Sequence, residues 1–198
     1  MALPQVKIDA TEARIAALDM PGGASWAAEA RKDALKRLRA MGLPGARDEY
    51  WRFTNPEALN RPDAPEAAVF DAGDESPVFG EIDRLKIVFV DGAFRADLSD
   101  DLTMAGLEIE RLADAQAKDI HWIRDLYGVL EARGQTPVAR PFAALNTALL
   151  RDGYALVLPR NVSLAAPLVI EWITAGADAM ATPRLLIIAE TGSSATVI

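Results

Sequence analysis

His121 is the single histidine of the 198-residue chain and the side chain best suited to acid–base or metal chemistry near neutral pH. Asp125 follows four residues later, a spacing that puts both side chains on one face of a helix. A zinc site normally has about three or four protein ligands, and the chain has no cysteine to complete one. The pair is therefore weak evidence for a metal centre, and we do not expect His121 to be a metal ligand or a catalytic residue.

Motifs for nucleophilic catalysis and for nucleotide binding are missing from the sequence. No Gly-x-Ser-x-Gly elbow presents a serine, and neither a Gly-x-Gly-x-x-Gly turn nor a Gly-x4-Gly-Lys-Ser/Thr loop occurs. Adjacent acids lie at 48–49, 74–75 and 100–101, whereas a glycosidase needs two carboxyl groups ~5–10 Å apart across a cleft. We therefore predict no catalytic residue, no metal ligand and no cofactor-binding residue in this chain, and we expect that it is not an enzyme.

The loop at 42–59 is unusually aromatic. It contains Tyr50, Trp51 and Phe53, interleaved with the charged residues Arg47, Asp48, Glu49 and Arg52. Such a cluster can form a binding site, but aromatic rings more often hold a loop onto the domain beneath it by burying their apolar surface. We favour the second interpretation, and expect changes within 47–54 to misfold the helical part of the chain more than to remove binding.

Composition excludes several classes of function. Hydrophobic residues make up 51% of the chain, enough for a packed core, and the net charge of −8 argues against nucleic-acid binding, which relies on Lys and Arg at phosphates. Without cysteine, this chain can form no disulfide and offers no thiolate to an iron–sulfur cluster. The N-terminus does not read as a signal peptide, and no apolar run approaches the ~20 residues of a membrane span. We expect a cytoplasmic protein that contacts no membrane.

Two helices are predicted at the front of the chain. Thr11 would cap a short helix over 12–19, and Ser25 would cap a longer one over 26–41 that ends at Gly42. The longer helix has an apolar stripe at helical spacing, formed by Ala27, Ala30, Ala34, Leu38 and Met41. It also has a basic side that we expect to be solvated, formed by Arg31, Lys32, Lys36, Arg37 and Arg39.

The middle of the chain mixes extended and helical patterns. Asp91-Gly92 lies between two extended segments and predicts a β-hairpin near 86–99, because both central positions of that turn favour φ > 0. Leu107 and Ile109 indicate a further strand. From about 112 a helical stripe follows, formed by Ile120, Ile123, Tyr127 and Leu130 and ended by Gly134.

The last third of the chain is predicted to be β-rich after one more short helix, which carries Phe142, Leu145 and Leu149. Strands are expected at 154–159, 168–173, 184–190 and 194–198, with turns at 161–163 and 192–194. Their even spacing suits a β-sandwich as well as a β-solenoid, and spacing alone does not choose between them.

Three stretches together resemble a known family. They are ALKRLRAMGLPGARDEYWRFTNPEAL, PFAALNTALLRDGYALVLPRNVSLAAPLVI and TPRLLIIAETGSSATVI. Their order and distances resemble the SufB/SufD family and, within it, the SufD subunit of the SUF iron–sulfur cluster assembly scaffold. The resemblance extends from about residue 25 to the end and is weakest between 60 and 135.

The resemblance implies an α+β fold with two domains. Residues 1–135 would form an N-terminal mainly helical domain that includes the hairpin, and 136–198 would form the first coils of a right-handed parallel β-helix. It also implies that the chain is an N-terminal fragment of a scaffold subunit that works with a SufB-like subunit and a SufC-type ATPase. The residues that the family uses for cluster chemistry lie in its C-terminal half, so none is carried onto this chain and no cofactor is expected in it.

Three alternatives stay open at this point. One is a carbohydrate-acting β-helix enzyme. Another is a self-contained β-sandwich interaction module, which predicts antiparallel pairing among the strands of 154–198. The last is a homodimer in which two open β edges pair, since an unpaired strand edge invites pairing with another chain.

Overall fold

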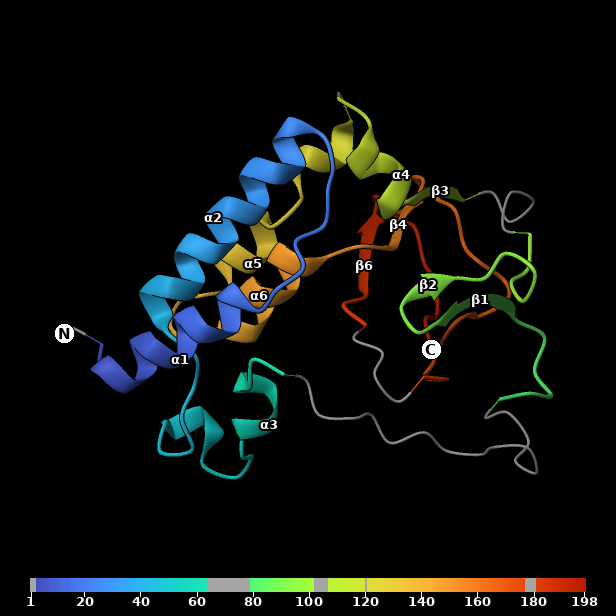
Figure 1. The fold of residues 1–198 in the computed structure, drawn as a ribbon. Coiled ribbons are helices and arrows are strands. Elements are labelled where there is room, and N and C mark those ends of the chain that lie inside the picture. The colour runs from blue at the N-terminus through green and yellow to red at the C-terminus, as the bar shows by residue number, and fades with distance from the viewer. Residues whose placement is uncertain (1–2, 64–78, 102–106, 120, 177–180) are drawn as a thin grey trace. The chain divides into compact units, whose positions relative to one another are not determined.

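The computed structural model describes residues 3–63, 79–101, 107–119, 121–176 and 181–198 (Figure 1). The chain divides into two compact units, and each is formed by two separate stretches of sequence. The helical unit comprises Met1–Pro65 and Asp114–Arg151, and the strand unit comprises Glu66–Ala113 and Asp152–Ile198. These units describe packing; the predicted domains 1–135 and 136–198 stay a prediction.

The helical unit begins with α1 (Gln5–Ala16) and α2 (Ser25–Met41), shown in blue in Figure 1. The turn η1 (Glu49–Trp51) and the short helix α3 (Glu57–Asn60) follow. Later in the chain come α4 (Leu112–Ala117), η3 (Trp122–Asp125), α5 (Val129–Arg133) and α6 (Pro141–Leu149). The helix α4 starts in one unit and ends in the other.

The core of the helical unit lies between α2 and α6, which pack side by side. Leu38 of α2, Leu43 just after it, and Leu145 and Leu149 of α6 are buried together. The predicted stripe of α2 is confirmed at Ala27, Ala34 and Leu38, which are fully buried. Gly42 ends the helix as predicted, with φ of 68°, and its N–H donates to the Leu38 carbonyl at 2.8 Å.

Both predicted helix caps are wrong. The helix α1 begins at Gln5, so Thr11 lies within it, where its hydroxyl donates to the Lys7 carbonyl at 2.6 Å and accepts from the Leu43 N–H at 2.9 Å. The helix α2 begins at Ser25 itself, after Ala24, and no side chain caps it. Instead, the Ala24 N–H donates to the Gln116 carbonyl at 2.8 Å. A contact with a distant part of the chain lies at the start of α2, whereas α1 begins directly after Pro4.

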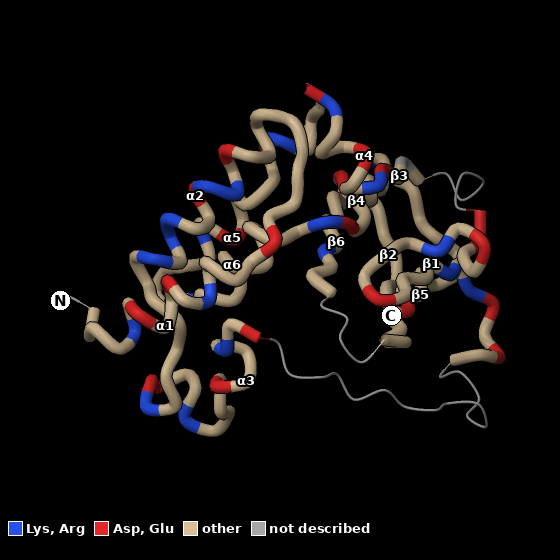
Figure 2. The backbone as a smooth tube through the Cα atoms, in the orientation of Figure 1, with Lys and Arg blue, Asp and Glu red and all other residues tan. Residues whose placement is uncertain are grey.

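Arg31 is not part of a solvated basic side. It is 3% exposed, whereas Lys32, Lys36 and Arg39 are exposed and Arg37 is half-buried. Figure 2 shows the positions of the basic residues along α2 in blue. Its guanidinium donates to the Gly22 carbonyl at 2.7 Å, to the Leu150 carbonyl at 3.3 Å and to the Gln116 side chain. Arg31 falls between Ala27 and Ala34 in helical spacing, so it shares their buried face.

The predicted helix from 112 to 134 is interrupted. Its residues form α4, η3 and α5, and Gly128 has a φ of 72°, which no right-handed helix contains. Ile123 and Tyr127 are buried as predicted, but Leu130 is 65% exposed because Gly128 changes the direction of the chain between them. Ile120 lies outside the described residues, and Gly134 follows α5 as predicted.

The described part of the strand unit contains two sheets of three strands each. One has the order β2-β1-β5, with β1 (Leu85–Val90), β2 (Ala93–Phe94) and β5 (Leu168–Ile173). The other has the order β3-β4-β6, with β3 (Glu108–Arg111), β4 (Gly153–Leu158) and β6 (Arg184–Ala189). The core between them contains Ile87, Phe89, Tyr154, Leu156 and Leu168.

The predicted hairpin is confirmed: β1 and β2 pair antiparallel, and the turn residues Asp91 and Gly92 have φ of 50° and 81°. The strand predicted around Leu107 and Ile109 is confirmed as β3, which pairs antiparallel with β4. In contrast, β1 pairs parallel with β5, and β4 pairs parallel with β6.

The predicted strand at 194–198 is wrong as a strand. This segment makes isolated parallel bridges from Ser194 to Ser163 and from Val197 to Leu168. The antiparallel pairing that a β-sandwich predicts within 154–198 is also wrong, because the pairing found there is parallel. The fold is mixed α/β, with helices and two small sheets.

Candidate functional site

His121, the side chain best suited to acid–base or metal chemistry, has a structural role in the local backbone. It lies at the N-cap of η3, where its Nδ1 accepts a hydrogen bond from the Ile123 N–H at 3.2 Å. Its ring lies 5.5 Å from the Trp122 ring, centroid to centroid. Asp125 pairs instead with Arg124 on the surface. The described residues contain no group of three or more His, Asp or Glu side chains placed to hold a metal ion.

The adjacent acids have local partners. Asp100 accepts from the Lys86 N–H at 2.8 Å, and Asp48 accepts from the Gly45 N–H at 2.9 Å. The pair at 74–75 lies outside the described residues. The hydrogen bonds of Asp48 and Asp100 are those of carboxylates that fix loops, and they do not form the facing pair that a glycosidase needs.

The three rings of the aromatic loop differ in burial: one packs on the domain, and two are exposed. Trp51 holds the loop in place: it is half-buried and packs edge-on against Phe142 of α6, with ring centroids 5.2 Å apart. Tyr50 is 69% exposed and Phe53 is 92% exposed. The guanidinium of Arg52 lies over the Phe53 ring at 5.3 Å. One ring therefore anchors the loop, and two are presented to solvent.

Asp48 fixes the loop to α1. Its Oδ2 accepts from the Lys7 ammonium at 2.5 Å, in addition to the Gly45 N–H. Partial burial alone would raise the pKa of Asp48, but the hydrogen bonds from Lys7 and Gly45 and the charge of Lys7 outweigh it. The pKa of Asp48 therefore lies below its ordinary value, and the carboxylate is charged at neutral pH.

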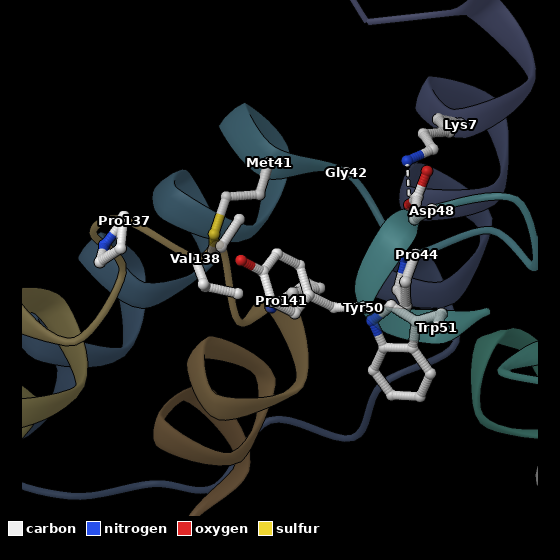
Figure 3. Close-up of a pocket in the computed structure, with 11 residues that line it drawn as sticks. Lys7, Met41, Gly42, Pro44, Asp48, Tyr50, Trp51, Pro137, Val138 and Pro141 are labelled. Carbon is white, nitrogen blue, oxygen red and sulfur yellow. Dashed lines mark hydrogen bonds and ion pairs between the residues drawn. The ribbon is translucent and has the colours of Figure 1, made fainter. Parts of the chain in front are cut away.

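A pocket of about 260 Å³ opens beside these residues (Figure 3). Figure 3 shows the Tyr50 ring between Val138 and Trp51, and the Lys7–Asp48 pair at one end. Met41, Pro44, Pro137 and Pro141 are further lining residues. A second pocket of about 210 Å³ shares Tyr50, Trp51, Val138, Ala139 and Pro141 with the first and is also lined by Arg140, Phe142 and Ala143. The sequence indicated the aromatic loop, but nothing in it indicated that 137–141 would form the opposite wall.

The strand unit contains a repeated arrangement of backbone. Strand β6 pairs residue 184 with 153 and 189 with 158, so the two strands are offset by 31 residues. The bridge between Ser163 and Ser194 has the same offset, and their hydroxyl oxygens lie 2.7 Å apart. Both predicted turns are found slightly earlier than predicted, over 159–162 and 190–193: Val162 N–H donates to the Pro159 carbonyl, and Ser193 N–H to the Glu190 carbonyl. One turn therefore stacks on the next along the same backbone path.

Asp152 and Gly153 form a junction that sequence reasoning missed as a special position. Asp152 is buried and accepts from the Arg111 guanidinium at 2.5 Å, and the Arg111 guanidinium carbon lies 5.6 Å from the Phe94 ring centroid. Gly153 has a φ of 151°, and a Cβ there would lie 2.0 Å from the Arg184 carbonyl oxygen. Only glycine permits β4 and β6 to approach this closely. The Asp152-Gly153 dipeptide, a common turn sequence, is the feature from which a special backbone position could have been predicted.

These features define a class of protein: a helical unit joined to a unit of parallel-stacked strands, without a metal cluster in the part that the structure describes. The family model described as "SufBD protein N-terminal region" matches residues 22–170. The chain belongs to the SufBD family. It is 27% identical over 174 residues to a Synechocystis protein described as "Iron-sulfur cluster assembly SufBD family protein", and the alignment covers 84% of this chain.

The chain spans 37% of the length of that relative. The predicted resemblance is therefore confirmed for the SufB/SufD family as a whole, while the SufD subtype stays a prediction. None of the helices in the described residues is long and apolar enough to cross a membrane.

Proposed function

We propose that this chain is the N-terminal part of a SufD-type scaffold subunit that acts in iron–sulfur cluster assembly. The observation that carries the proposal is the family match over 22–170, which includes residues from both units. The Synechocystis relative, which aligns with 84% of this chain, is described as an iron–sulfur cluster assembly protein. The proposed setting is the cytoplasm.

The proposed fold of the strand unit is the start of a right-handed parallel β-helix. The constant offset of 31 residues between β4 and β6, and between Ser163 and Ser194, supports one coil of that length. The turns at 159–162 and 190–193 have the same hydrogen bond, which supports a second coil on the same path. The antiparallel strands β2 and β3 would then act as a cap, as stable repeat proteins require.

The proposed partners are a SufB-like subunit and a SufC-type ATPase. Ile187, Val197 and Ile198 are each about 40% exposed at the end of the stack that β2 and β3 do not cover. An apolar strand edge of this kind needs a covering segment. In the proposed scaffold, further coils of the longer subunit cover it. Homodimer formation through the same edge is the second candidate that this observation favours.

We propose no catalytic residue and no resident cofactor for this part of the subunit. This proposal is supported by the use of His121 as a helix cap and by the local hydrogen bonds of Asp48 and Asp100. A carbohydrate-acting enzyme stays a prediction that no arrangement of the described side chains favours.

Affinity purification of the natural full-length protein from its own cells tests the proposed function. The tag is placed at the C-terminus, and the co-purifying proteins are identified and quantified by mass spectrometry. We expect a SufB-like subunit and a SufC-type ATPase in amounts similar to the tagged protein, and lower activity of iron–sulfur enzymes after deletion of the gene. Recovery of the protein alone, with normal iron–sulfur enzyme activity in the deletion strain, would falsify the proposal.

A further inference from the structure

The two adjoining pockets beside Tyr50 are built for an extended chain rather than for a cofactor. Small-molecule pockets typically have volumes of ~300–1,000 Å³ and enclose most of the ligand. The pockets here have volumes of about 260 and 210 Å³ and share the lining residues Tyr50, Trp51, Val138, Ala139 and Pro141. Each is the size of a site for one or two side chains. Two neighbouring sites of this size suit alternate side chains of an extended segment.

The walls offer apolar surface and unused hydrogen-bond donors. Met41, Pro44, Pro137 and Val138 supply aliphatic surface, and the Tyr50 ring projects between them, 69% exposed. Among the described residues, neither the Tyr50 hydroxyl nor the Trp51 indole N–H has a hydrogen-bond partner, whereas the Trp26 indole donates to the Lys118 carbonyl at 2.8 Å. Tyr and Trp combine an apolar face with a donor, and both are enriched at the centres of protein interfaces.

The charge around the pockets is positive, in contrast to the net charge of −8 for the whole chain. Arg140 lines the second pocket, and Arg47 and Arg52 flank the lining residues Asp48 and Trp51. Among the described residues, none of these arginines pairs with a carboxylate, and Asp48, the acid in the pocket lining, pairs with Lys7. Arg52 is exposed, and its guanidinium lies over the Phe53 ring, where it can meet a carboxylate of a partner.

We propose that this face of the helical unit is a docking site for an extended acidic segment of a partner protein, with apolar side chains in the two pockets. Tyr50 and Trp51 contact the apolar side chains and donate to the backbone of the segment, and Arg47, Arg52 and Arg140 meet its acids. The Trp51–Phe142 contact and the Lys7–Asp48 pair hold the site in shape before the segment arrives. The site lies wholly within the helical unit. It does not depend on the proposed cluster-assembly role.

Fluorescence anisotropy with the whole 198-residue chain tests the proposal. The probe is a fluorescein-labelled peptide with the sequence Glu-Asp-Leu-Phe-Asp-Glu, and the comparison probe is Lys-Arg-Leu-Phe-Arg-Lys. We expect saturable binding of the acidic peptide and binding of the basic peptide that is weaker by at least about tenfold. No other protein is present, so a failure here leaves the proposed function in cluster assembly untouched.

Matched variants locate the site. Tyr50→Ala and Arg140→Glu are each expected to lower the affinity for the acidic peptide by about fivefold or more, because both side chains are exposed in the proposed site. Leu59→Ala and Lys32→Glu are the controls, an exposed apolar residue and an exposed lysine outside the pocket lining, and each should change binding by less than about twofold. Circular dichroism confirms that each variant is folded.

Three outcomes would overturn the proposal. One is the absence of saturable binding of the acidic peptide to the folded chain. Another is equal binding of the acidic and basic peptides, which would exclude an acidic partner. The last is an equal loss of affinity in Lys32→Glu and Arg140→Glu, which would show attraction to the general charge of the protein instead of a defined site.

Discussion

The helical unit and the strand unit keep their shapes by different means. In the helical unit, single side chains connect distant segments: Arg31 bonds to carbonyls at Gly22 and Leu150, and Trp51 packs on Phe142. In the strand unit, the backbone itself repeats, with the same pairing and the same turn after 31 residues. A unit that depends on individual side chains should be sensitive at those residues. A unit that depends on a backbone repeat should be sensitive where backbones come closest.

The largest effect is expected in the strand unit, at Gly153. In Gly153→Val, the Cβ would lie 2.0 Å from the Arg184 carbonyl oxygen, so β4 and β6 must separate. We expect a loss of at least about 3 kcal/mol in the free energy of unfolding, or no folded strand unit. Urea unfolding followed by circular dichroism measures it. The control is Gly22→Ala, which meets no atom within 4 Å and should be close to neutral; equal stability of both variants would contradict the close approach.

The corresponding position in the helical unit is Arg31. Arg31→Met keeps much of the side-chain volume but leaves the buried Leu150 carbonyl and the buried Gln116 side chain without this donor. The expected loss is about 2–3 kcal/mol, because each unsatisfied buried polar group costs roughly 1–3 kcal/mol. Thermal unfolding of this variant is compared with Lys32→Met, an exposed neighbour on the same helix. If both variants unfold at the same temperature, the bonds of Arg31 contribute nothing.

Within the aromatic loop, substitutions at Trp51 and Phe53 compare an anchoring ring with an exposed ring. Trp51→Ala removes a half-buried ring that packs on Phe142, and we expect a loss of about 2 kcal/mol. Phe53→Ala removes a ring that is 92% exposed, and we expect a change within ~0.5 kcal/mol. Both are measured as denaturation midpoints under one condition. A loss of equal size for Phe53→Ala would show that the loop is not anchored through Trp51 alone.

The smallest effect concerns the Lys7–Asp48 pair and depends on pH. The pKa of Asp48 is lower in the folded chain, so the folded state is stabilised at pH values above the ordinary aspartate pKa of about 3.9. That stabilisation is lost as the pH falls through the lowered pKa. The pair is partly exposed, so solvent screening keeps its contribution below about 1 kcal/mol. The stability difference between the natural chain and Asp48→Asn should therefore shrink at low pH; a difference that grows would reverse the sign of the pKa shift.

Local chemistry made several parts of the fold predictable. The Asp91-Gly92 hairpin, the end of α2 at Gly42 and the helix at 141–149 follow from turn preferences and apolar spacing within a few residues. The caps at Thr11 and Ser25 failed for the opposite reason. Thr11 lies within α1 and bonds to Leu43, and Ala24 just before Ser25 bonds to Gln116, so both positions have partners far along the chain that no local pattern shows.

The candidate site was predictable only in part. The sequence identified the aromatic loop and its charged neighbours. It predicted one anchoring role for all three rings, whereas in the structure only Trp51 anchors the loop and the other two rings are exposed. Trp51 anchors because Phe142 lies beside it, and Tyr50 lines a pocket because 137–141 forms the facing wall. Both partners come from about 90 residues further along the chain, beyond the reach of any local pattern.

The sequence by itself determined the class of most segments, the likeness to the SufB/SufD family and the lack of cysteine, because residue order and local spacing carry that information. The tertiary structure alone decided which strands pair in parallel, that Arg31 is buried and that Gly153 must be glycine. Strand register and burial depend on which distant segments meet in space. In this chain those meetings join residues that are separated by 31 and 83 positions in the parallel strand pairs and by as many as 132 in the helical unit.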